Sequence, residues 1–234
     1  MNKDKFIEEL KQIGIEVTDQ KLNQLEIYYE MLVEYNKVMN LTGITEKEEV
    51  YLKHFYDSLT ICKIIDLNKE ETLCDVGTGA GFPGLVLKIF FPNLKITLVD
   101  SLNKRIKFLN DVINKLNLKK IETKHERMEE YSRKNIEKFD VVTARAVAQM
   151  HFLLEVAIPM LKINKNFIAM KGNIENEIDY QIAMNELSCE QKDIIKFKLP
   201  MEKSNRTLIK IEKKEPTPKI FPRKYNDIKK KPLI

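Results

Sequence analysis

The fold of this 234-residue chain is decided by the stretch Asp75-Val76-Gly77-Thr78-Gly79-Ala80-Gly81-Phe82-Pro83-Gly84. The stretch overlaps the end of a short apolar run, residues 72–76, which predicts a β-strand. Its alternate glycines let the backbone turn tightly and approach a ligand that a Cβ atom would exclude. Pro83 stands where the first turn of a helix tolerates proline. The stretch therefore predicts a strand, a binding loop and a helix, as found at the carboxyl ends of strands in open α/β sheets.

Six further apolar runs predict the other strands of the same sheet. They span residues 96–99, 121–124, 139–143, 167–170, 194–199 and 208–211. Between most of them lie helical stretches, notably residues 102–117 and 150–161. This alternation predicts an α/β fold, with a mostly parallel sheet of seven strands and helices on both of its faces. Only residues 200–206 separate the last two runs, so we expect these to close the sheet as an antiparallel hairpin.

Residues 1–66 predict a helical N-terminal extension to this sheet. Apolar residues recur every three or four positions between residues 22 and 39, and Thr18 precedes them as the expected N-cap. Thr45 begins a pattern of the capping-box type, which predicts the start of another helix. The α/β domain itself is expected over residues 67–212.

The net charge of +5 is concentrated at the C-terminus. Residues 212–234 hold eight Lys or Arg against three acids, so the preceding part of the chain is balanced. Four of the eight prolines fall in the same stretch and oppose a long helix. We expect residues 213–234 to form a basic, extended arm suited to a polyphosphate partner. A solvated and partly disordered C-terminus fits the composition equally well.

Composition indicates a globular protein of the cell interior. The chain is 43% hydrophobic and 32% charged, and no apolar run approaches the roughly 20 residues of a membrane span. Residues 1–11 lack the apolar core of a secretory signal. We therefore expect a cytoplasmic protein with no membrane partner. Cys62, Cys74 and Cys189 lack the spacing of a disulfide framework or a zinc site, so we interpret them as reduced core thiols and expect no metal.

Two cofactors are compatible with the glycine loop. The segment from Gly79 to Gly84 satisfies GxGxxG, the fingerprint of dinucleotide binding. Three features favour S-adenosylmethionine instead: the acid Asp75 inside the strand, the Gly-x-Gly-x-Gly register that begins at Gly77, and the bulky Phe82. An acid at this point can help to hold the ammonium group of a methionine moiety, whereas it would repel a pyrophosphate.

A second acid, Asp100, ends the next predicted strand about twenty residues past the glycines, where a carboxylate can accept hydrogen bonds from both ribose hydroxyls of either cofactor. The alternative is an ordinary acid at the start of a helix. Ser101 is the expected N-cap of the helix that follows.

Together and in order, several segments resemble the bacterial small-subunit ribosomal RNA guanine-N7 methyltransferases, also called the glucose-inhibited division protein B family. The resemblance runs the whole length and rests, besides the glycine loop, on Tyr35-Asn36-Lys37, Asn40-Leu41-Thr42, His54, Asp57-Ser58, Asp100-Ser101, Lys104-Arg105, Arg145-Ala146, Lys171-Gly172, Phe221-Pro222-Arg223-Lys224 and Lys230-Lys231-Pro232-Leu233. One departure is Tyr35, where the family frequently has tryptophan; the swap keeps an aromatic ring.

The resemblance implies a Rossmann-like class I methyltransferase fold and S-adenosylmethionine as cofactor. It also implies methylation of N7 of one guanine, at the position called 527, in the decoding-region loop of 16S ribosomal RNA. The partner would be naked 16S RNA, the small ribosomal subunit or an assembly intermediate, and we expect a monomer.

Roles for individual residues follow in part from the resemblance and in part from the loop. The resemblance implies cofactor contacts at Gly77, Phe82, Met128, Glu129 and Arg145. The loop analysis adds Asp75, Thr78, Gly79, Gly81, Asp100 and Ser101. RNA contact or activity is implied for Lys104, Arg127, Lys171 and Arg206, to which we add Arg105 as a phosphate contact.

The chemistry of guanine N7 fits these residues, because its in-plane lone pair can attack a methyl group without prior removal of a proton. A general base is therefore unnecessary, and catalysis should come mostly from alignment. Arg145 and Lys171 end predicted strands, so we expect them to position the RNA at the ligand-binding edge. Four polar residues have two possible roles: they either pack and cap helices or form one rim of a guanine pocket. The sequence does not distinguish these roles for Asn36, Asn40, His54 and Asp57.

Three other functions remain open. The chain could methylate another RNA, a protein or a small molecule, or it could be an NAD-binding oxidoreductase that uses the same glycine loop. It could also be an RNA-binding module that keeps the fold without the cofactor.

Overall fold

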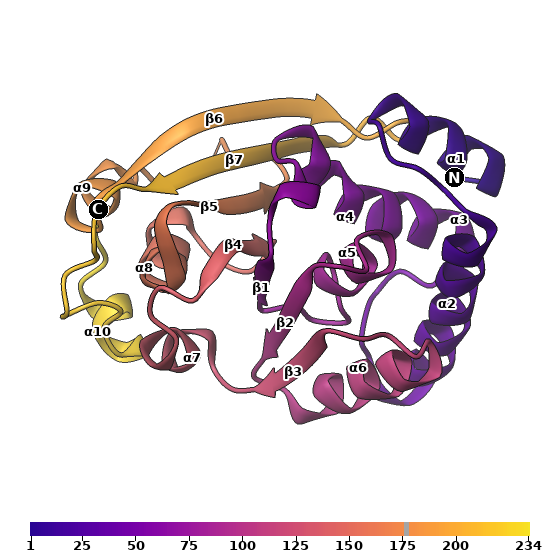
Figure 1. The fold of residues 1–234 in the computed structure, drawn as a ribbon, viewed down its shortest axis with the longest axis horizontal. Helices are drawn as coiled ribbons and strands as arrows, with labels where there is room; N and C mark the ends of the chain where they lie inside the picture. Colours follow the sequence, from indigo (N-terminus) through magenta and orange to yellow (C-terminus); the bar gives the residue numbers. More distant parts are fainter. Residues whose placement is uncertain (176–177) are drawn as a thin grey trace.

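The structure, a computed structural model, describes residues 1–175 and 178–234. Its centre is a seven-stranded sheet in the order β3-β2-β1-β4-β5-β7-β6 (Figure 1). The strands are β1 (Thr72–Val76), β2 (Lys95–Asp100), β3 (Ile121–His125), β4 (Phe139–Arg145), β5 (Leu161–Lys171), β6 (Cys189–Lys198) and β7 (Asn205–Lys213). Strands β1 to β5 pair in parallel, whereas β7 runs antiparallel to both β5 and β6. The mostly parallel sheet and its closing hairpin are therefore confirmed.

Each face of the sheet is covered by helices, as predicted. Successive residues of a strand point to opposite faces, so Leu98 joins one hydrophobic cluster and Val99 the other. The first cluster includes the apolar faces of α5 (Gly84–Phe90) and α6 (Asn103–Lys115). The second includes α8 (Met150–Met160), with α7 (Met128–Lys134) and α9 (Gln181–Glu186) beside it.

The N-terminal region is helical and packs into the first of these clusters. Its elements are α1 (Lys3–Gln12), α2 (Asp19–Met39), α3 (Lys47–Val50), a π-helical turn (Tyr51–Tyr56), α4 (Asp57–Leu59) and two 3₁₀ turns (Thr60–Lys63 and Leu67–Lys69). Thr18 caps α2 as predicted, since its Oγ1 accepts from Lys21 N at 3.3 Å. The domain boundary between residues 66 and 67 stays a prediction, because these helices share one core with the sheet.

Two predicted N-caps are wrong. Helix α3 follows Glu46, and no side chain caps it, so the pattern at Thr45 does not form a capping box. The first turn of α3 is exposed, and water can satisfy its N–H groups. Helix α6 follows Leu102 instead of Ser101. The carboxylate of Asp100 accepts from Leu102 N at 2.9 Å, so the acid itself holds the turn that leads into the helix.

The C-terminal segment is folded onto the domain, which corrects the expectation of an extended arm. Phe221 and Ile228 are buried, and residues Tyr225–Lys230 form a short helix, α10, beside α7 and α8 (Figure 1). Arg223 donates to the fully buried carboxylate of Glu155 on α8, from Nε at 2.8 Å and from Nη2 at 2.6 Å. Composition could not reveal this anchor, because it depends on one tail arginine having a buried partner.

None of the helices in the described part of the chain has the length and apolar character needed to traverse a bilayer.

Helix α2 braces the glycine loop through one side chain. Tyr28 is fully buried, its hydroxyl donates to the carbonyl of Ala80, and its ring stacks on Phe82 with 5.5 Å between centroids. A buried carbonyl that loses its only donor bears a desolvation cost. The N-terminal helices therefore hold the loop in shape.

Tyr28→Phe should lower the free energy of unfolding by about 1–2 kcal/mol, because Ala80 O loses its donor in a buried place. The matched control is Tyr35→Phe, which removes a hydrogen bond to Asp111 in an exposed position and should cost less than about 0.5 kcal/mol. Urea unfolding measures both values. Equal losses in the two variants would contradict a bracing role for Tyr28.

Candidate active site

The glycine loop is held from behind by Asp75, at the end of β1. Its buried Oδ2 accepts from Thr78 Oγ1 at 2.7 Å and from Gly84 N at 2.8 Å. Burial raises the pKa of Asp75 to about 6, although both hydrogen bonds oppose that rise. The carboxylate thus fixes the two ends of the loop, and it lines neither of the two cavities described below. An ammonium contact by Asp75 remains a prediction.

Asp100 joins the glycine loop to the start of α6. Its Oδ2 accepts from Gly79 N at 2.9 Å and from Arg105 Nη1 at 3.1 Å, and Oδ1 accepts from Leu102 N. The position of Asp100 thus supports both interpretations from the sequence. It lines a cavity, as a ribose-binding acid would, and it stands at the start of a helix. Arg105 pairs with Asp100, and its expected contact with RNA stays a prediction.

Two cavities open at the carboxyl edge of the sheet and share Gly77, Arg105 and Val147 as lining residues. The first, here called the β2 cavity, measures about 550 Å³ and lies between the end of β2 and the starts of α7 and α8. The second, the arginine cavity, measures about 470 Å³ and lies between the glycine loop and the ends of β4 and β5.

The structure distributes the predicted cofactor residues over both cavities. The β2 cavity is lined by Gly77, Asp100, Ser101, Met128 and Glu129. The arginine cavity is lined by Gly77, Thr78, Gly79, Phe82 and Arg145. Gly81 lines neither; a Cβ there would lie 2.6 Å from the Tyr28 hydroxyl, so this glycine serves the packing of α2.

Asp57 organises the cations of the arginine cavity. It is only 5% exposed, and it accepts from Arg206 Nε at 2.9 Å and from Arg145 Nη1 at 3.2 Å. Arg145 also donates to the carbonyl of Lys53 at 3.0 Å. Lys171 ends β5 on the same wall and donates to the carbonyl of Ala148. Strand ends far apart in the sequence thus bring three predicted basic residues to one cavity.

His54 packs beside this group as a neutral imidazole. Its ring stacks on Phe82 at 4.4 Å, and its Nδ1 lies 3.3 Å from Arg145 Nη2. Nδ1 also lies 3.2 Å from the carbonyl oxygen of Lys53, and Nε2 lies 2.9 Å from Thr42 Oγ1. Burial, together with the charge of Arg145, lowers the pKa of His54 to about 3.

The four polar residues left open by the sequence separate into two pairs. His54 and Asp57 line the arginine cavity. Asn36 instead caps the end of α2, since its Oδ1 accepts from Leu41 N and Thr42 N at 2.6 and 2.9 Å. Asn40 is the left-handed C-cap of the same helix. The two asparagines therefore cap a helix, whereas His54 and Asp57 lie at the rim of the cavity.

Other predicted basic residues lie outside the arginine cavity. Lys104 is exposed and donates to the carbonyl of Met39 at 2.6 Å. Arg127 is exposed at the mouth of the β2 cavity and lies over the ring of Tyr225, 4.8 Å from its centroid. The β2 cavity is also lined by residues of the C-terminal segment that the sequence did not predict: Tyr225, Ile228, Lys229 and Pro232. No local spacing could have revealed them, because they come from the far end of the chain.

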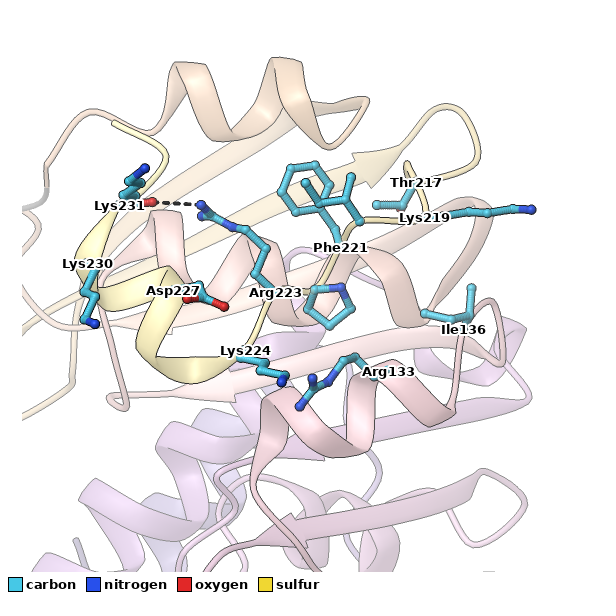
Figure 2. Close-up of a pocket in the computed structure, with 12 residues that line it drawn as sticks. Arg133, Ile136, Thr217, Lys219, Phe221, Arg223, Lys224, Asp227, Lys230 and Lys231 are labelled. Atoms are coloured by element: carbon cyan, nitrogen blue, oxygen red, sulfur yellow. Dashed lines mark hydrogen bonds between the residues drawn. The ribbon is translucent and has the colours of Figure 1, made fainter.

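A third, strongly basic cavity lies between α7 and the C-terminal segment (Figure 2). It measures about 860 Å³, and among the described residues Asp227 is the one acid that lines it. Arg223 spans its inner side and donates to the carbonyl of Lys231 at 2.9 Å. The remaining cations that line it are Arg133, Lys219, Lys224, Lys230 and Lys231.

Among the residues that the structure describes, no group of His, Cys, Asp and Glu is arranged to hold a metal ion. Cys74 and Cys189 are buried free thiols, and Cys62 is a partly buried one.

The low pKa of His54 predicts a specific acid sensitivity. The unfolded chain takes up a proton near pH 6.5 that the folded protein resists until about pH 3, so His54 lowers stability as pH falls between these values. At about pH 5 the loss should be about 2 kcal/mol relative to neutral pH. His54→Gln should lack this part of the loss in urea unfolding, whereas the exposed His125→Gln should keep it. A wild-type pH dependence in His54→Gln would refute the buried, neutral state.

Comparison with known proteins identifies the family. The family model described as rRNA small subunit methyltransferase G matches residues 21–209. Ribosomal RNA small subunit methyltransferase G of Macrococcus caseolyticus is 48% identical over 238 residues, covering 100% of both chains. The protein of that name from Bacillus thuringiensis is 47% identical over 237 residues, covering 100% of this chain and 99% of its own.

Solved structures share the fold at low identity. A SAM dependent methyltransferase from Aquifex aeolicus superposes with a TM-score of 0.53 at 16% identity, over 76% of this chain and 98% of that one. TYW2 of P. horikoshii, in complex with MeSAdo, gives a TM-score of 0.54 at 12% identity, over 67% of this chain and 61% of that one. The Rossmann-like methyltransferase fold is thus confirmed. With full-length relatives at nearly half identity and a family model over most of its length, the chain belongs to the rRNA small subunit methyltransferase G family.

Proposed function

We propose that this protein uses S-adenosylmethionine to methylate N7 of a guanine in 16S ribosomal RNA. One observation carries the proposal: at Gly77, the cavity that holds the buried acids Asp100 and Glu129 meets the cavity that holds Arg145 and Arg206. The first fits a nucleoside-bearing cofactor, and the second fits a polyanionic substrate. Family membership supports a ribosomal RNA substrate, since the relatives carry that name. The position on the base comes from the resemblance described above and is the finer part of the proposal.

The loop suits S-adenosylmethionine better than a dinucleotide. A pyrophosphate needs free backbone N–H groups at the loop. Here the N–H groups of Gly77 and Thr78 donate to Val99 O, that of Gly79 to Asp100, and that of Gly84 to Asp75. An NAD-binding oxidoreductase would therefore lack its phosphate cradle.

The residues of the β2 cavity fit the adenosine part of the cofactor. Asp100 accepts three hydrogen bonds where a carboxylate offers about four lone-pair sites, which leaves room for a ribose hydroxyl. Glu129 is 3% exposed, and its Oε1 has no hydrogen-bond partner among the described residues. Such a buried acceptor calls for a donor, and an adenine amino group is one. Met128 would add an apolar contact, and Gly77 with Phe82 would hold the methionine part.

The proposed chemistry needs alignment more than proton transfer. When bound, S-adenosylmethionine supplies a methyl group on a positively charged sulfur. Arg145 and Arg206, both fixed by Asp57, would bind and orient the nucleotide so that N7 keeps its lone pair for attack. Lys171 would assist them from the end of β5. No proton has to leave N7, so the neutral His54 has no general-base role to fill.

The proposed RNA surface extends beyond the arginine cavity. Lys104 and Arg127 are exposed outside it, and the basic cavity of the C-terminal segment adds further cations (Figure 2). Contacts of this kind bind phosphates, which position an RNA without reading its sequence. We expect a monomer to act on 16S RNA, either naked, in an assembly intermediate or in the small subunit. Binding should weaken steeply as salt increases.

Gly79→Ala tests the cofactor site with a matched control. Gly79 and Gly14 both have positive φ, +63° and +74°, and a Cβ at either would meet no protein atom within 4 Å. Both alanine variants should therefore lose a similar roughly 1–2 kcal/mol of unfolding free energy. Of the two, only Gly79 lies in the binding loop, where its N–H donates to Asp100 of the β2 cavity at 2.9 Å. Calorimetric titration should show S-adenosylmethionine affinity about tenfold weaker or worse in Gly79→Ala and unchanged in Gly14→Ala; equal affinities would oppose this site.

Mapping of the transferred methyl group tests the substrate. The wild type and Gly14→Ala should label 16S RNA or small subunits from radiolabelled S-adenosylmethionine, and Gly79→Ala should label them much less. Chain scission specific for N7-methylguanosine should then occur at one guanine of 16S RNA. Label in another RNA or on another atom would overturn the finer proposal. Binding of the donor with no label in any RNA would favour a small-molecule substrate or a binding module.

A further inference from the structure

The C-terminal segment contributes a wall to the β2 cavity. Four of its residues line that cavity together with Asp100 and Glu129: Tyr225, Ile228, Lys229 and Pro232. Residues 225, 228 and 229 have the three-to-four spacing of one helical face of α10. Lys224, Asp227, Lys230 and Lys231 line the basic cavity instead (Figure 2). One short helix thus separates two cavities of different chemistry.

The wall is anchored by buried contacts. Beyond its two side-chain bonds to Glu155, Arg223 also donates from its backbone N to Oε1 at 2.9 Å. Glu155 is fully buried, so this bidentate pair is shielded from solvent at its acidic end. Ile228 is 1% exposed, and Leu233 packs against the cluster that contains α8. These contacts place the segment on the domain without any need for RNA.

Tyr225 connects the segment to residues already assigned to the cofactor. Its ring meets Phe152 of α8 edge-on, with 6.1 Å between centroids. Arg127 lies over the same ring, and its Nη1 is 3.7 Å from Glu129 Oε1. The aromatic ring, the guanidinium and the carboxylate therefore form one continuous side of the β2 cavity. Apolar and aromatic walls with a few polar groups are typical of sites for planar ligands.

We propose that Tyr225 and Ile228 of the C-terminal segment are part of the S-adenosylmethionine site and enclose the adenosine portion of the cofactor. This inference rests on the proposed function, because it takes the β2 cavity as the place of the adenosine. It gives the segment a second role besides a basic surface for phosphates. The face formed by Lys230 and Lys231 keeps the RNA role, and the face formed by Tyr225 and Ile228 serves the cofactor.

Binding to three full-length variants tests the assignment. Tyr225→Ala should weaken the affinity for S-adenosylmethionine by about fivefold or more, measured by calorimetry, because a ring contact is lost from the site. Tyr225→Phe keeps the ring and should bind within about twofold of the wild type. The control Lys230→Ala/Lys231→Ala changes the other face and should leave cofactor affinity unchanged while it weakens binding to 16S RNA. A folded Tyr225→Ala with wild-type affinity overturns the inference.

Hydrogen exchange on the wild type gives an answer even if Tyr225→Ala does not fold. S-adenosylmethionine should slow amide exchange in residues 223–231 as well as in the glycine loop. Protection of the loop without protection of residues 223–231 would overturn the inference that the C-terminal segment encloses the cofactor, but it would leave the proposed function intact. Protection of neither segment, with no measurable binding, instead overturns the proposed function itself.

Discussion

The site depends on one buried carboxylate, that of Asp75. Its Oδ2 holds Thr78 at the first turn of the loop and Gly84 at the first turn of α5, so both ends of the glycine stretch are tied to the end of β1. A Cβ at Gly84 would lie 2.3 Å from Leu98 Cδ2 and 2.8 Å from that oxygen, which is why this position needs glycine. The cost of burying the acid is visible in its pKa of about 6. The buried acid fixes the geometry of the glycine loop, and this loop forms part of the wall of both cavities.

A second carboxylate, Asp57, does for the substrate side what Asp75 does for the loop. A free arginine side chain has many rotamers, and its entropy must be lost when it binds an anion. Asp57 orders Arg145 and Arg206 in advance, and His54 adds a neutral surface that does not repel them. Preorganised donors cost no reorganisation at the moment of reaction. The N-terminal helical region thus contributes to the site itself as well as to the core.

Features determined by neighbours in sequence could be predicted, and features determined by distant partners could not. The strands, the glycine loop and the closing hairpin follow from local periodicity and turn chemistry. The pairing of Asp57 with Arg206 spans 149 positions, and nothing near either residue announces it. The tail was expected to be an arm because its prolines and charges are typical of one, whereas Arg223 has a buried partner on α8. The sequence predicts Ser101 as the N-cap of α6, but the carboxylate of Asp100, one position earlier, already accepts from Leu102 N at the start of that helix.

Arg105 shows why the two cavities cannot act independently. Among the described residues it is the one cation that lines both, and its guanidinium shares Asp100 Oδ2 with the N–H of Gly79. One ribose hydroxyl could use the remaining lone-pair site of Asp100, whereas a second hydroxyl would compete with Arg105 for its site. A weakened hold on Arg105 frees its charge toward the arginine cavity. Under the proposed function, cofactor binding would therefore raise the positive charge available to RNA, and by linkage bound RNA would strengthen cofactor binding by the same factor.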